Sequence, residues 1–100
     1  MQNKIYRQGD IIIQAIKELP ADLKLRKNTI ILYGEVTGHK HQLLKGKVLD
    51  GKDLIYLSLA KDSAIVHEEH NTINLKAGNY AVLRTREYDY SAKKIRTILD

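Results

Sequence analysis

Residues 48–59 read Val-Leu-Asp-Gly-Lys-Asp-Leu-Ile-Tyr-Leu-Ser-Leu, which is two apolar, β-rich runs separated by a polar turn. The dipeptide Asp50-Gly51 is favoured in β-hairpins because Gly and Asp tolerate the left-handed backbone that tight turns require. This stretch therefore predicts a hairpin with one strand over Val48–Leu49 and a second over Leu54–Leu59.

Similar short segments, rich in β-branched and aromatic residues and separated by Gly or Pro, occur on both sides of the hairpin. The expected strands cover residues 5–6, 11–16, 29–33, 36–44, 63–67, 80–90 and 95–99, and only residues 22–27 and 91–96 suit helical turns. This spacing predicts a mainly β chain that forms a small antiparallel barrel-like or sandwich domain, with at most one or two short helical turns. A length of 100 residues suits a single domain spanning 1–100.

The composition excludes some kinds of site and favours one class of partner. The chain has no cysteine, which excludes disulfides and thiolate metal sites and favours a reducing, cytoplasmic location. The N-terminal residues lack the apolar core of a signal peptide, and no apolar run is long enough to cross a membrane. A formal net charge of +5 favours anionic partners such as nucleic acids or nucleotides.

The strongest chemical signal is two histidine pairs, His39-Lys40-His41 and His67-Glu68-Glu69-His70. On a strand, His39 and His41 point to the same face because side chains alternate. His67 and His70 lie on the same side only if their segment forms a helical turn. In an extended segment their two rings face opposite ways. All four histidines fall between positions 39 and 70, so we expect them to contribute to one site.

Three interpretations of this site are open. Four histidines near pH 7 suit metal-free acid–base catalysis on an RNA-like phosphodiester, in which one group accepts the 2′-OH proton and another protonates the leaving 5′-oxygen. The same side chains, with Glu68 or Glu69, could instead ligate zinc or manganese. The third interpretation is a non-catalytic module that binds RNA or a protein. The alternative to all three functional interpretations is a polar strand face that carries histidines by chance.

A basic and aromatic segment near the C-terminus complements the histidines. On a regular strand, Arg84, Arg86 and Tyr88 share a face, where guanidinium groups can hold phosphates and tyrosine can stack on a base. We take these three residues and Lys40 as candidate substrate-binding residues. Salt bridges on an exposed strand face are the alternative role for the arginines.

The chain also resembles a family of small bacterial and phage proteins. The resemblance rests on the segments 6–10 (Tyr-Arg-Gln-Gly-Asp), 34–41 (Gly-Glu-Val-Thr-Gly-His-Lys-His), 67–70, 78–80 and 86–88, and on the terminal Asp100. This family is similar to the CRISPR-associated ring nucleases, which destroy cyclic oligoadenylate messengers. The resemblance implies a cytoplasmic, metal-independent phosphodiesterase that damps type III CRISPR signalling without a cofactor, and that uses His39, His41, His67, His70, Arg86 and Tyr88.

We also expect a homodimer. A domain of this size buries a limited share of its surface, so association would add stability. Cyclic oligonucleotides have rotational symmetry, and a two-fold dimer would place one site against each half of such a ligand.

Overall fold

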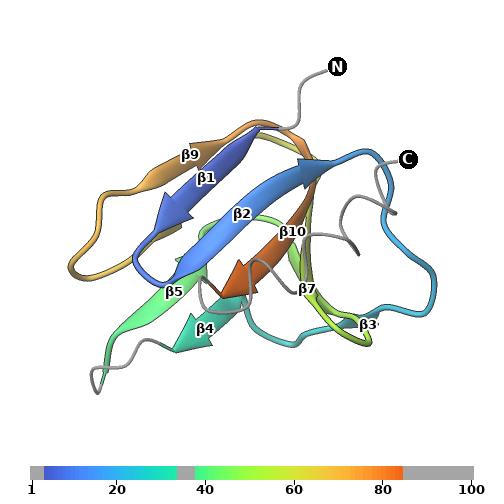
Figure 1. The fold of residues 1–100 in the computed structure, drawn as a ribbon, viewed down its shortest axis with the longest axis horizontal. Helices are drawn as coiled ribbons and strands as arrows, with labels where there is room; N and C mark the ends of the chain where they lie inside the picture. Colours follow the sequence, from blue (N-terminus) through green and yellow to red (C-terminus); the bar gives the residue numbers. More distant parts are fainter. Residues whose placement is uncertain (1–3, 34–37, 85–100) are drawn as a thin grey trace.

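The computed structural model describes residues 4–33 and 38–84, and every regular element in these ranges is a β-strand (Figure 1). The strands are β1 (Ile5–Gln8), β2 (Ile11–Ile16), β3 (Lys24–Leu25), β4 (Ile30–Tyr33), β5 (Lys40–Leu43), β6 (Lys47–Asp50), β7 (Ile55–Leu59), β8 (Ser63–Val66), β9 (Ile73–Leu75) and β10 (Gly78–Arg84). They form a six-stranded sheet in the order β1-β2-β10-β7-β6-β3 and a four-stranded sheet in the order β4-β5-β8-β9. All pairings are antiparallel, so the predicted small, mainly β antiparallel sandwich is confirmed.

The main core lies between the two sheets and is built from alternate residues of their strands. Ile11 and Ile13 of β2 and Leu57 and Leu59 of β7 point into it from the larger sheet. Strand β10 is buried on both faces: Tyr80 and Val82 join this core, and the residues between them face away from it.

A second, smaller cluster covers the other face of the larger sheet. Ala81 and Leu83 of β10 pack there with Tyr56, and Leu19 and Leu23 from the segment between β2 and β3 pack against them. Because this segment covers the sheet, the central strand β10 is shielded from water on both sides.

Two side chains link the sheets along their edges. Nε2 of Gln8, in β1, donates to the carbonyl oxygens of Ile65 in β8 and Asn71, at 3.0 and 2.8 Å. On the other side, Arg26 makes a bidentate contact with Asp50 of β6 and donates through Nη1 to the carbonyl oxygens of residues 30 and 31 in β4. The Arg26 bonds satisfy backbone acceptors of the edge strand β4, and the Gln8 bonds satisfy acceptors in the internal strand β8 and in the segment that follows it.

The predicted hairpin is confirmed, since β6 and β7 pair with Asp50 opposite Ile55, and the N–H of Gly51 donates to the Leu54 carbonyl across the turn. The predicted helical turn over 22–27 is wrong. Lys24–Leu25 instead forms β3, paired with β6, because the cross-strand bonds and the Arg26 contacts outweigh the weak local preference for a turn. The second predicted helical turn (91–96), the last strand (95–99) and the distal part of the strand expected over 80–90 lie outside the described residues.

Candidate functional site

The four histidines meet in one cluster centred on His67. Its ring centroid lies 5.6 Å from that of His39, 4.4 Å from that of His41 and 4.6 Å from that of His70. His41 lies in β5, and His67 follows the last residue of the neighbouring strand β8. The segment after β8 bends rather than continuing as a strand or a helix, and this bend brings His70 back to His67.

The cluster has a buried and an exposed side. His41 is fully buried, His39 and His67 are partly exposed, and His70 is exposed. His41 therefore differs from the other three histidines, because its ring has no surface that a substrate could reach. It was predicted as a catalytic residue, and the structure places its ring in the interior, packed on His67.

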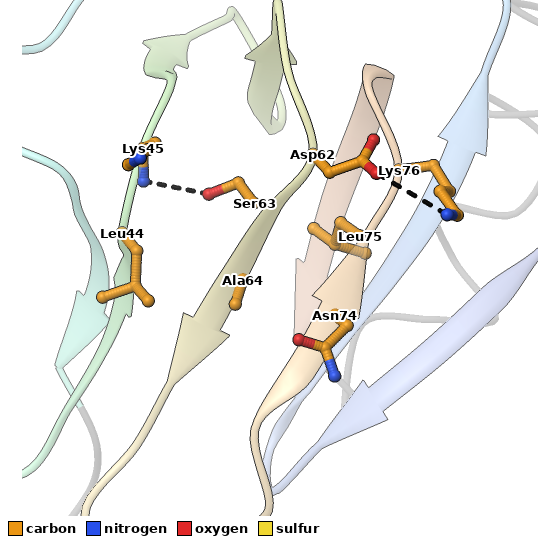
Figure 2. A pocket seen from close by; sticks show the side chains of 8 residues that line it. All are labelled: Leu44, Lys45, Asp62, Ser63, Ala64, Asn74, Leu75 and Lys76. Carbon is orange, nitrogen blue, oxygen red and sulfur yellow. Dashed lines mark hydrogen bonds and ion pairs between the residues drawn. The ribbon is translucent and has the colours of Figure 1, made fainter.

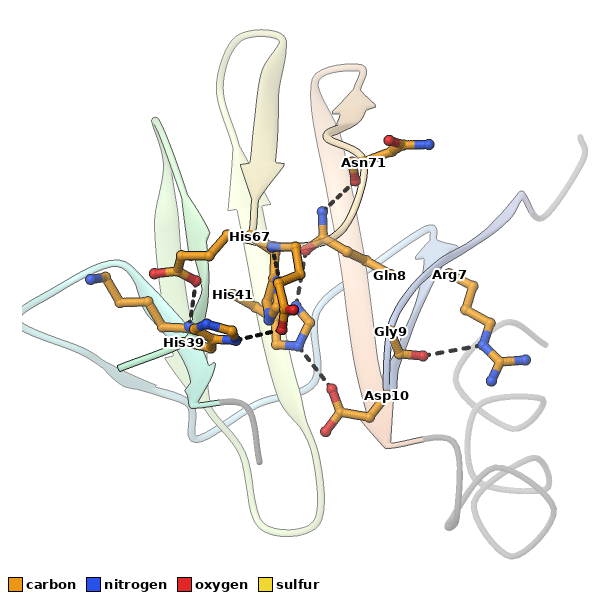
Figure 3. Close-up of polar contacts among 11 residues, drawn as sticks. Arg7, Gln8, Gly9, Asp10, His39, His41, His67 and Asn71 are labelled. Carbon is orange, nitrogen blue, oxygen red and sulfur yellow. Dashed lines mark hydrogen bonds and ion pairs between the residues drawn. The ribbon is translucent and has the colours of Figure 1, made fainter. Parts of the chain in front are cut away.

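Both ring nitrogens of His41 have partners from the chain around the β1–β2 turn. Nδ1 lies 2.9 Å from Oε1 of Gln8, and Nε2 lies 2.8 Å from Oδ1 of Asp10 (Figure 3). Gln8 is itself buried, with its Nε2 committed to two carbonyl oxygens. Its Oε1 is therefore the acceptor, and Nδ1 of His41 carries a proton.

Glu69 sets the proton positions on the two neighbouring rings. Its backbone N–H donates to Nδ1 of His67 at 3.0 Å, so the proton of the neutral His67 ring resides on Nε2. Its carboxylate Oε1 lies 2.9 Å from Nδ1 of His39 (Figure 3), which makes that nitrogen the donor and leaves Nε2 of neutral His39 with a lone pair. One residue thus gives two adjacent histidines opposite roles at Nε2.

Two further contacts shape the exposed side. The Lys40 backbone N–H donates to Oε1 of Glu68 at 2.8 Å, and this bond is the main cause that lowers the pKa of Glu68 below its ordinary value. Gly9 has a φ of +59°, and a Cβ there would lie 2.6 Å from Nε2 of His70. The His70 ring therefore packs directly on a backbone position where only Gly fits.

Both a carboxylate, Asp10, and a cation, Arg84, lie near the histidine cluster. Partial burial raises the pKa of Asp10, but the hydrogen bond from His41, with help from the Arg84 charge, outweighs it and lowers the pKa below its ordinary value. Burial lowers the pKa of His41, and Asp10 opposes this shift. Arg84 ends β10 opposite Ile11, next to Asp10 in the chain, which places a cation beside the histidine cluster.

Of the predicted substrate-binding residues, Arg84 lies near enough to Asp10 for its charge to act on that carboxylate. Lys40 stands between His39 and His41 in the sequence, and the alternation of side chains along β5 directs it to the face opposite His41. Arg86 and Tyr88 lie outside the described residues. Sequence reasoning missed Gln8 and Asp10 as site residues, although both fall in the Tyr6–Asp10 segment. Gln8 and Asp10 are 33 and 31 positions away from His41 in the sequence, so no local pattern indicates that they contact its ring.

The four histidines that were candidate metal ligands lie in this same cluster. Within residues 4–33 and 38–84, no three His, Asp or Glu side chains form a group that could hold a metal ion. The neutral His67 ring carries its proton on Nε2, so this nitrogen donates rather than coordinates in the arrangement observed. Nδ1 of His41 is likewise protonated, and its Nε2 faces Asp10.

Two surface cavities of about 420 Å³ differ in their relation to the cluster. One is a polar groove beside Arg84, whose charged lining residues are Arg26, Asp50, Lys52, Asp53 and Arg84. The other lies at the opposite end of β8 from His67, between Leu44, Ala64 and Asn74, where Lys76 and Asp62 form an ion pair (Figure 2). No histidine lines either cavity, but the first is lined by Ile11, which follows Asp10 in the chain, and by Arg84, whose charge acts on Asp10.

The family assignment follows from the stretch that contains this site. The family model described as "Domain of unknown function (DUF8820)" matches residues 7–85. The chain belongs to the DUF8820 family. The matched stretch includes all four histidines, Gln8, Asp10, Glu69 and Arg84, so the whole described site lies within the family domain. No curated protein and no solved structure matches the chain.

In the described residues, no helix is both long and apolar enough to pass through a membrane.

Proposed function

We propose that this DUF8820 protein is a metal-independent phosphodiesterase that cleaves RNA-type phosphodiesters by histidine acid–base catalysis. The observation that carries the proposal is the pair His39 and His67, in which Glu69 leaves one Nε2 as an acceptor and the other as a donor. Cleavage of RNA by its own 2′-OH needs these two properties side by side.

In the proposed mechanism, Nε2 of His39 accepts the proton of the 2′-OH, and the 2′-oxygen attacks phosphorus. Nε2–H of His67 donates to a non-bridging oxygen and stabilises the charge that develops there. The bond from phosphorus to the 5′-oxygen breaks, and His70, as an imidazolium, gives its proton to that oxygen. The products are a 2′,3′-cyclic phosphate and a 5′-hydroxyl.

The substrate would extend from the histidines toward the polar groove beside Arg84. The Arg84 guanidinium is placed to balance phosphate charge, and the groove volume of about 420 Å³ is in the range of small-ligand sites. Lys40, Arg86 and Tyr88 complete the proposed substrate-binding set. Cyclic oligoadenylate is the first substrate we propose, and its cleavage would damp type III CRISPR signalling in the cytoplasm.

A metal-dependent hydrolase is the second candidate, favoured by one observation. The carboxylate of Glu69 on Nδ1 of His39 is the contact that often orients a metal-ligating histidine. Zinc or manganese would then bind at Nε2 of His39.

A cleavage assay tests both candidates. Chelator-treated protein is incubated with cyclic oligoadenylates of several ring sizes and with short linear RNA, beside the variants His39→Ala, His67→Ala and Lys76→Ala. We expect cleavage that persists in chelator, leaves cyclic phosphate ends, is lost in both histidine variants, and is unchanged in Lys76→Ala, whose ion pair lies at the distant cavity.

The other outcomes separate the alternatives. Activity that appears only after zinc or manganese is added supports the metal-dependent hydrolase. Salt-dependent binding without turnover supports a non-catalytic nucleic-acid-binding module. We also propose a homodimer, because a two-fold dimer matches a symmetric cyclic ligand. A monomer mass in light scattering at the assay concentration contradicts it.

A further inference from the structure

The end of the sandwich opposite the histidines is formed by three connections that cross between the two sheets. They join β5 to β6, β7 to β8 and β9 to β10, over residues 44–46, 60–62 and 76–77. The pairings of β5 with β8, of β8 with β9 and of β7 with β10 bring these connections to the same end. His67 follows β8 at its other end, so this surface is separate from the histidine cluster.

Lysines supply most of the charge at this end. The charged residues of the three connections, together with the first residue of β6, are Lys45, Lys47, Lys61, Lys76 and Asp62, and all of them are exposed. Oδ2 of Asp62 lies 3.6 Å from Nζ of Lys76, and its Oδ1 accepts a backbone N–H at 2.9 Å. Lys45, Lys47 and Lys61, which we call the basic rim, make no ion pair with any residue that the structure describes.

A cavity of about 420 Å³, whose lining includes Lys45, opens on the outer face of the four-stranded sheet. Leu44, Ala64 and Asn74 lie in a row there (Figure 2), since the Leu44 N–H donates to the Ala64 carbonyl and Ala64 pairs with Asn74. Ala64 is 7% exposed, whereas Leu44 beside it is 58% exposed. The small side chain between two larger ones leaves a hollow, which we call the Ala64 cavity.

The wall of this cavity holds hydrogen-bonding groups that the described residues do not use. The Asn74 side chain is exposed and makes no hydrogen bond within the described part of the chain, so its amide offers both donors and an acceptor. Oγ of Ser63 accepts the Lys45 backbone N–H at 2.9 Å and keeps its own proton to donate. The side chain of Leu44 supplies an apolar wall.

These features together match one class of ligand. A nucleobase has apolar faces and an edge with adjacent donors and acceptors, which an amide such as that of Asn74 can bind in a bidentate contact. Phosphates flank each base along a strand, and lysines bind them as point charges. A base enters a cavity only when it is unstacked, which a single strand permits and a paired duplex resists. An acidic peptide matches the basic rim alone.

We propose that this end of the sandwich binds single-stranded nucleic acid, with one base in the Ala64 cavity and the adjoining phosphates on the basic rim. The ion pair of Lys76 and Asp62 is neutral as a unit and lies outside the proposed contacts. This site does not depend on the proposed phosphodiesterase, because no histidine lines the cavity. It holds a strand and does not react with it.

The test is fluorescence anisotropy with a labelled DNA strand of about ten nucleotides, a length in the range of single-strand binding sites. Deoxyribose lacks the 2′-OH, so the proposed phosphodiesterase cannot cleave this strand, and binding is measured alone. The double variant Lys45→Gln/Lys61→Gln should bind about 10-fold more weakly, and the slope of log K against log salt should fall by about 0.7 for each lysine removed. Lys24→Gln/Lys27→Gln has the same net charge and alters exposed lysines in and beside β3, so it should bind as the native chain does.

A second pair of variants tests the cavity. Asn74→Asp replaces the amide by a carboxylate of nearly the same shape, so binding should weaken by about 5-fold or more, the size of one bidentate amide–base contact. Asn28→Asp is the matched control, because it adds the same charge before β4 and keeps the oxygen that accepts the Ile30 N–H. In the native chain labelled with ¹⁵N, the Asn74 side-chain amide and Ala64 backbone signals should shift when the strand is added.

Several results would overturn the proposal. Either variant may bind as tightly as its control, or the NMR shifts may be confined to the histidine end. A duplex of the same sequence that binds as tightly as the strand would show that no base enters the cavity. An oligoglutamate of equal charge that binds as tightly would indicate an acidic peptide partner instead. An inactive protein in the cleavage assay refutes the phosphodiesterase and leaves this test intact, because the DNA strand needs no turnover.

Discussion

Gln8 and His41 are 33 positions apart in sequence, yet Oε1 of Gln8 lies 2.9 Å from Nδ1 of His41 in the buried interior. The Gln8 amide also donates twice to backbone carbonyls, so a single side chain closes one edge of the sandwich and fixes the tautomer of a buried histidine. Fold and site therefore depend on the same three hydrogen bonds.

Replacement of Gln8 by Leu tests this dependence. The variant leaves the Ile65 and Asn71 carbonyls and the His41 N–H without their partner, and it should lower the free energy of unfolding by about 2–4 kcal/mol. Urea denaturation measures the change. Gln42→Leu is the matched control, since within the described part of the chain the Gln42 side chain makes only a long 3.4 Å bond to Thr29, and its loss should cost less than about 1 kcal/mol. Equal losses in the two variants would contradict the role of Gln8.

Gly9→Ala should displace His70. Gly9 has a φ of +59°, and a Cβ there would lie 2.6 Å from Nε2 of the His70 ring. Gly38→Ala carries a comparable backbone strain, with a φ of +86°, but its Cβ would meet no atom of the described residues within 4 Å. In both variants the left-handed backbone should lower the free energy of unfolding by about 1–2 kcal/mol. Gly9→Ala should lower it further, because its Cβ also clashes with the His70 ring. Only Gly9→Ala should shift the NMR signals of His70, and an unmoved ring would refute the packing described.

Two neighbouring glutamates give a matched pair for the proposed chemistry. Glu69→Gln removes the charge beside Nδ1 of His39 but leaves the backbone N–H that holds His67. Cleavage should fall by about 10-fold or more, within the range that general acid–base groups contribute. Glu68→Gln changes a carboxylate that contacts the Lys40 backbone, so it should retain most of the activity. Equal rates in the two variants would remove Glu69 from the mechanism.

The stability of the protein should decrease in acid, in two stages. The pKa of folded His41 lies below its usual value of 6.5 because of burial, so its contribution is complete above pH 6.5 and declines as the pH falls through the folded pKa. The pKa of Asp10 is also lowered, from 3.8, so its contribution is complete above about pH 4 and is lost at lower pH. Urea midpoints across this pH range measure both stages. Asp10→Asn should flatten the lower stage, and an unchanged acid branch would count against the assignment.

Most strands were predictable because their composition and alternation are local properties. The hairpin over 48–59 and the apolar alternation of 11–16 needed no knowledge of partners. The shared face of His39 and His41 followed from strand periodicity in the same way, and both rings do contact His67. Strand β3 was mispredicted because two residues carry little local signal and form a strand only against β6.

The sequence alone determined a mainly β chain and showed that all its histidines lie within one stretch of 32 residues. Only the tertiary structure decided how those histidines differ. Burial of His41, the contacts from Gln8 and Asp10, and the opposite proton positions that Glu69 gives His39 and His67 all arise where chain segments meet. Periodicity specifies the face on which a side chain lies, but a ring's proton follows the partner at each nitrogen, and those partners are set by how the strands pack.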